Sequence, residues 1–254
     1  MSGTFAPMPG SAPLGRQVLA QTRMEARLML RNGEQLLLAV IIPVIALVGA
    51  VEGAKQLGHH FDHPPVDVFT PGVLALAVMS TAFTSLAIAT GFERRYGVIK
   101  RLGASPLSRT GLLLGKIGAL LCVEVLQIAL ISVVGLCLGW SPKAGVVGAV
   151  LGVVLGTAAF ASLGLFVAGT LRAEATLAAA NLIYLLLLAG GAVVLPASSY
   201  GGWGDVAQWL PSGALGDAMR SAFIDSQIAW GPLGILLAWA AVGTALTART
   251  FTWE

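Results

Sequence analysis

A short basic island, ERRYGVIKRLGASPLSR at residues 93–109, separates two long apolar runs of the sequence. The runs on either side, at about 68–92 and 111–139, are long enough to cross ~30 Å of hydrocarbon as helices. A basic loop between two such helices is typical of the cytoplasmic side of a membrane. Because the flanking segments offer no groups for a charged ligand, we expect this loop to receive a signal from a soluble partner.

The composition of the whole chain agrees with a membrane protein. Of its 254 residues, 56% are hydrophobic and only 11% are charged, whereas about a quarter are charged in a soluble domain. The basic residues cluster beside apolar runs, which carries information about orientation rather than forming a groove for nucleic acid. The sequence therefore predicts an all-α integral membrane protein with no nucleic-acid partner.

Six apolar runs predict six membrane-spanning helices in a single domain over residues 14–254. The predicted spans lie at about 35–52, 68–92, 111–139, 144–171, 175–195 and 231–251. Residues 1–13 are rich in proline, glycine and serine and carry no charged side chain, so we expect a disordered tail.

Most of the lysines and arginines fall on one side of this arrangement, which places both termini in the cytoplasm by the positive-inside rule. We expect the chain in the plasma (inner) membrane, with residues 52–67 and 196–230 facing outward. The basic residues on the inner side are Arg16, Arg23, Arg27, Arg31, Arg94, Arg95, Lys100, Arg101, Arg109, Arg172 and Arg249.

Two segments outside the spans also have helical patterns. Residues 14–34 alternate apolar and basic side chains, which predicts an amphipathic helix on the inner membrane surface or, alternatively, an extension of the first span. Residues 205–227 predict short outward helices, broken at 211–213, that dip into the outer leaflet; a surface-lying helix would give the same pattern. The apolar stripe of this segment consists of Leu215, Met219, Ala222 and Phe223.

Several catalytic motifs are absent from the sequence. The nearest approach to a phosphate-binding loop, GLLLGKI at 111–117, has its glycines one residue too close, lacks a Ser or Thr after the lysine and enters an apolar run. The three histidines, His59, His60 and His63, share one outward loop, which excludes an intramembrane serine protease and is a weak basis for a metal site. We expect neither enzymatic activity nor a bound metal or cofactor.

Gly148, Gly152 and Gly156 form two overlapping GxxxG repeats in the fourth predicted span. Small residues at this spacing let helices approach closely. We expect close packing here, within one protomer or between two.

Glu124 lies near the middle of the third predicted span, where a carboxylate must face protein or water. Gln127, one turn later, is placed to hydrogen-bond it, and Lys116 is placed to extend toward the cytoplasmic surface. Two interpretations stay open, a structural polar clasp and a lining of the substrate path. Asn181 and Tyr184 on the fifth span are weaker candidates for the same path.

The island at 93–109 resembles the cytoplasmic loop of type-2 ABC transporter permeases. In that family an acidic residue closes the second span, a glycine follows, and a Pro-Leu-Ser segment precedes the third span; the loop forms the coupling helix that docks on the ATPase subunit. Here Arg95 stands where a second acid is common, and Val98 where threonine is common. The coupling residues that the resemblance implies are Glu93, Arg94, Arg95, Gly97, Lys100, Arg101 and Pro106.

The resemblance implies a permease subunit of an ATP-driven exporter for a hydrophobic or amphipathic substrate, such as a drug, a lipid or a glycan-linked compound. ATP and Mg²⁺ would bind to a separate soluble ATPase subunit. A second permease copy, identical or similar, would form the transport pathway together with this chain, and membrane lipids would surround both. Two other functions are a proton-coupled secondary transporter that uses Glu124 and a non-transporting assembly subunit. In a further interpretation the basic island only enforces topology and binds anionic lipid.

Overall fold

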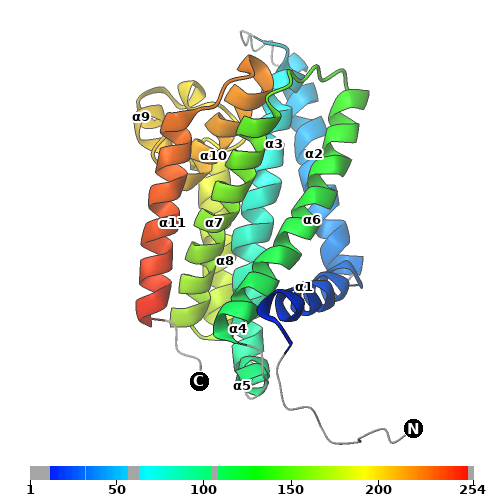
Figure 1. Cartoon of the computed structure of the whole chain (residues 1–254). Helices are drawn as coiled ribbons and strands as arrows, with labels where there is room; N and C mark the ends of the chain where they lie inside the picture. The colour runs from blue at the N-terminus through cyan, green and yellow to red at the C-terminus, as the bar shows by residue number, and fades with distance from the viewer. Residues whose placement is uncertain (1–11, 32, 57–62, 104–107, 251–254) are drawn as a thin grey trace, which may run out of the picture.

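The computed structural model describes residues 12–31, 33–56, 63–103 and 108–250. Long helices run side by side in one bundle, with one helix lying across an end of it (Figure 1). The elements in chain order are α1 (Leu14–Arg31), α2 (Gly33–Gln56), α3 (Pro65–Met79), η1 (Ser80–Ser85), α4 (Leu86–Arg95), α5 (Val98–Gly103), α6 (Arg109–Cys137), α7 (Val146–Thr170), α8 (Ala173–Gly190), η2 (Ala197–Trp203), α9 (Gly204–Ala207), α10 (Pro211–Arg220), η3 (Ser221–Asp225) and α11 (Trp230–Thr250).

Among the described residues, five helical segments are long and apolar enough to cross a membrane. They confirm the all-helical membrane architecture but not the predicted count of six spans. The predicted first span, 35–52, lies in α2, where the side chains of residues 34–39 are outside the described part. The five segments are Pro65–Arg95, Thr110–Cys137, Val146–Thr170, Ala173–Gly190 and Trp230–Thr250.

The second predicted span is one continuous helical rod made of α3, the π-helical segment η1 and α4. It runs from Pro65 to Arg95, so it extends further at both ends than the predicted 68–92. Nearly every residue of α3 is buried, because α2, α6, α7 and α10 pack around it. This rod is therefore the centre of the bundle, and it leads directly into the basic island.

The amphipathic helix α1 lies across the end of the bundle at which α5 projects (Figure 1). It does not extend α2, so the alternative of a lengthened first span is wrong. Its buried face packs on α6, where glycines replace larger residues: a Cβ added at Gly118 would lie 2.6 Å from Thr22 Oγ1. We call this end, where α11 also finishes, the α5 end.

The helix α10 occupies the opposite end of the bundle, where it packs among α3, α7 and α11. Proline at its first position begins the helix, because the missing N–H has no intrahelical partner there. The predicted stripe of this segment faces inward: Leu215, Met219 and Ala222 are fully buried. Whether α10 enters the outer leaflet stays a prediction.

Candidate functional site

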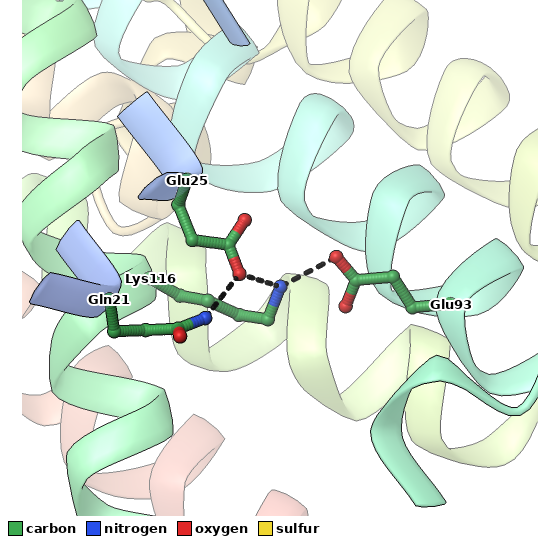
Figure 2. Close-up of polar contacts among 4 residues, drawn as sticks. All are labelled: Gln21, Glu25, Glu93 and Lys116. Atoms are coloured by element: carbon green, nitrogen blue, oxygen red, sulfur yellow. Dashed lines mark hydrogen bonds and ion pairs between the residues drawn. The ribbon is translucent and has the colours of Figure 1, made fainter. Parts of the chain in front are cut away.

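A buried cation joins three helices at the α5 end. Lys116 on α6, only 7% exposed, places its Nζ atom 2.7 Å from Glu93 Oε1 on α4 and 3.1 Å from Glu25 Oε1 on α1. Gln21 Nε2 donates to the same Glu25 oxygen at 2.9 Å (Figure 2). Moving one of these helices away would leave a buried charge without its partner, which is costly. The contacts therefore couple the positions of α1, α4 and α6.

The position of Lys116 corrects the prediction that it extends to the cytoplasmic surface. Its side chain stays inside the protein because α1 crosses the end of the bundle and brings Glu25 to it, 91 residues away in the sequence. Desolvating an ammonium group is costly, and two carboxylates offset that cost.

The two arginines that follow Glu93 reach sideways from α4 to α7 and α8. Arg94 Nη1 donates to the Ala168 carbonyl on α7, and Arg95 forms an ion pair with Glu174 on α8. The end of the central rod is thus held on this side as well.

The short helix α5 follows a turn at Gly97, whose φ of +66° favours a residue without a Cβ. Arg101 Nη2 donates to the Tyr96 carbonyl at 3.0 Å, while the side chains of Lys100 and Arg101 remain exposed. The next helix begins with a cap, because Ser108 Oγ accepts from the Gly111 N–H at 3.0 Å. Pro106 lies outside the described residues.

Two of the four candidate path residues, Glu124 and Gln127, are buried. Glu124, 1% exposed, accepts from Thr157 Oγ1 on α7 at 2.7 Å through Oε2, and its Oε1 has no hydrogen-bond partner among the described residues. The oxygen Oε1 of Gln127 accepts from Thr81 Oγ1 on η1 at 2.8 Å. Both side chains are enclosed within the protomer.

The other two candidates lie on α8. Asn181 is exposed and donates to the Leu177 carbonyl of its own helix at 2.9 Å. Tyr184 is half-buried and hydrogen-bonds with Ser80 of η1. The four candidates therefore differ in exposure: Glu124 and Gln127 are buried, Tyr184 is half-buried and Asn181 is exposed.

The three glycines of α7 face α10 and the segment that follows it, within the same protomer. A Cβ added at Gly156 would lie 2.7 Å from Leu215 Cδ1, and one at Gly152 would lie 3.4 Å from Met219 Sδ. At Gly148 the added atom would lie 3.0 Å from the Gln227 carbonyl. These glycines allow α10 to pack directly on the backbone of α7.

A comparison with known protein families shows to which family this architecture belongs. The family described as ABC-2 family transporter protein matches residues 66–249, which run from the start of the central rod to the end of α11. The chain belongs to the ABC-2 transporter family. No curated protein and no solved structure was found to match it.

Membership makes this ABC-2 protein a multi-pass membrane protein and a permease subunit of an ABC transporter. Its family partner is an ABC ATPase subunit, and the permease is the transport component rather than the nucleotide-binding enzyme. The matched region contains Glu93, Lys116 and the whole of α5, whereas α1 lies outside it.

Sequence reasoning missed a second buried cation of the permease, Arg220 at the end of α10. Its guanidinium donates to the carbonyls of Ala192, Val193 and Val194 at 3.0–3.3 Å and pairs with Asp217 at 2.8 Å. Burial lowers the pKa of Arg220 while Asp217 opposes that shift, and a guanidinium keeps its charge. Because the carbonyls are 26–28 residues away in sequence, no local pattern pointed to this contact.

Proposed function

We propose that this chain is the permease subunit of an ATP-driven exporter and that α5 is its coupling helix. The substrate class we favour is hydrophobic or amphipathic: a drug, a lipid or a glycan-linked compound. The ATPase subunit would bind ATP and Mg²⁺ and move α5, and the membrane helices would alternate between inward and outward states. Membership of the ABC-2 family and the position of α5 support this proposal.

The observation that carries the proposal is the way α5 projects past the ends of α7 and α8 (Figure 1). Lys100 and Arg101 are exposed on this short helix, where positive charge favours docking on a complementary surface. The helix continues from the central rod through one turn at Gly97, so a displacement of α5 acts on the most buried helix of the bundle.

The Lys116 cluster gives this displacement a route into other helices. Glu93 lies in the last turn of α4, two residues before the end of the central rod, and its ion pair with Lys116 joins it to α6. The second ion pair, with Glu25, adds α1. In our proposal α1, α4 and α6 move as one unit when the ATPase closes.

The pathway itself belongs, in this proposal, between two permease copies rather than inside one. Glu124 and Gln127 are sealed between α6, α7 and η1, so they act as a structural clasp in this conformation. The side chains exposed along the spans are mostly large and apolar. A pathway between two such surfaces suits an apolar or amphipathic substrate better than a small charged solute. The second copy is identical or similar, and both termini of each copy are cytoplasmic.

Co-purification with a candidate ABC ATPase tests the proposal. The Lys100→Ala/Arg101→Ala variant removes two exposed charges from α5, and we expect it to lose most of the bound ATPase while the wild type retains it. A matched control, Lys55→Ala/Lys143→Ala, removes two exposed charges at the opposite end. We expect the control to retain the ATPase.

If only the control lost the ATPase, the ATPase would dock at the opposite end of the bundle, and the proposed topology would be wrong. If both variants retained the ATPase equally, α5 would not be the docking element. Each variant is first compared with the wild type by gel filtration and thermal unfolding, so that loss of binding is not confused with loss of the fold.

A further inference from the structure

A pocket of about 490 Å³ lies at the α5 end, between the last turn of α4 and the connection from α7 to α8. Arg94, Arg95 and Arg172 line it together with a single acidic residue, Glu174. The acid already pairs with Arg95. Because Arg94 donates to the Ala168 carbonyl and Arg95 pairs with Glu174, Arg172 is the arginine of this lining that bears on a ligand.

Arg172 is the cation available to a ligand. Its side chain makes no hydrogen bond or ion pair with any residue of the described ranges, and it precedes α8 as the N-cap without capping the helix. The first N–H groups of a helix lack intrahelical partners and attract anions. The arginine and the start of this 18-residue helix thus point to the same kind of ligand.

A buried hydroxyl lies behind the wall of the pocket. Thr176, on the first turn of α8, is fully buried, and its Oγ1 has no hydrogen-bond partner among the described residues. Its side chain lies against Gly91, which lines the pocket: a Cβ added there would lie 3.4 Å from Thr176 Oγ1. This hydroxyl does not line the pocket, so the groups that the pocket offers to an anion are Arg172 and the first N–H groups of α8.

The pocket lies at the boundary of the membrane rather than at the tip of the docking helix. Three apolar spans have their ends there: Pro65–Arg95 and Val146–Thr170 finish at it, and Ala173–Gly190 begins at it. Leu171, which lines the pocket, and Leu177, one turn into α8, are 38% and 39% exposed and offer an apolar surface for an acyl chain. Basic pockets between spans on the cytoplasmic side are sites where anionic lipid headgroups bind.

We propose that this pocket binds the phosphate of an anionic phospholipid from the inner leaflet, with its acyl chains along α8. The phosphate bridges Arg172 and the start of α8 to the end of α4, which leads into α5. The site does not depend on the identity of the transported substrate.

Native mass spectrometry of the full chain in detergent tests this site. Phosphatidylglycerol is titrated against the wild type, and the fraction of protein that carries one lipid gives an apparent Kd. We expect Arg172→Gln to weaken binding about tenfold or more, because it removes a charge-assisted contact to the phosphate. Arg172→Lys should recover most of the affinity and shows that the position tolerates substitution.

A control variant tests where the lipid binds, and two competing ligands test whether the site prefers an anionic lipid. Arg23→Gln removes one exposed charge from α1 at the same end, and we expect its affinity to match that of the wild type. Phosphatidylcholine and inorganic phosphate should compete weakly. Equal affinity of Arg172→Gln and wild type, or full competition by either of these two probes, would overturn the lipid site. So would a loss of ATPase binding in Arg172→Gln with unchanged lipid affinity, which would assign the pocket to protein docking.

Discussion

At the scale of single residues, Lys116 joins α1, α4 and α6 at the α5 end. Its ammonium group is shared by two carboxylates from helices that are remote in sequence. The sequence showed a lysine inside a span but not its partners, because neither glutamate lies at a helical spacing from it. Contacts of this kind arise from the crossing of α1 over the bundle, which no local pattern predicts.

Replacing Lys116 with methionine should destabilise the protein by about 3 kcal/mol, because it leaves Glu25 and Glu93 partly buried without a cation. The thermal unfolding midpoint in detergent measures the effect. The triple variant Glu25→Gln/Glu93→Gln/Lys116→Met removes all three charges and should recover much of the loss. A wild-type midpoint for the single variant would show that the cluster does not contribute to stability.

Glu124→Gln should leave the unfolding midpoint and ATP-driven transport close to the wild type. The amide keeps an oxygen that accepts from Thr157, and the replaced carboxyl is sealed inside the protomer. Thr157→Val, in contrast, removes the donor and should cost about 1–3 kcal/mol. Loss of transport in Glu124→Gln with an intact fold would favour the proton-coupled alternative.

At the scale of the elements, the apolar runs predicted the ends of the five apolar segments to within three residues, with one exception. The run at 175–195 continues in sequence beyond Gly190, where α8 ends. The chain turns there because Ala192 adopts a positive φ of 53° and the carbonyls of Ala192 and Val193 accept hydrogen bonds from Arg220 on α10. Hydropathy could not show this end, since the residues of the turn are as apolar as those of the helix.

The packing of α10 against this turn makes Gly216 a sensitive position. An added Cβ would lie 2.6 Å from the Val193 carbonyl and 2.8 Å from Arg220 Nη2. Gly216→Ala should therefore destabilise the protein by about 1–3 kcal/mol through overpacking. Gly234→Ala on α11 is the matched control, because an added Cβ there meets no atom within 4 Å. Equal midpoints for the two variants would contradict the close packing of α10.

At the scale of the whole molecule, the two ends of the bundle differ in kind. One end carries α1, the Lys116 cluster and the projecting α5, and the other is filled by α10 and its connections (Figure 1). The asymmetry suits a subunit that receives force at one end. The family and the helical architecture were accessible from the sequence, because apolar runs and the loop at 93–109 are local features. The burial of Glu124 and the Arg220 contacts needed the arrangement of helices in space.

Site-specific photocrosslinking in intact membranes tests the central claim, that α5 docks on the ATPase, most directly. A photoreactive amino acid in place of Lys100 should crosslink to a co-expressed partner ATPase, and the same group in place of the exposed Lys143 at the other end should not. Crosslinking from position 143, or none from position 100 although the complex co-purifies, would contradict the account.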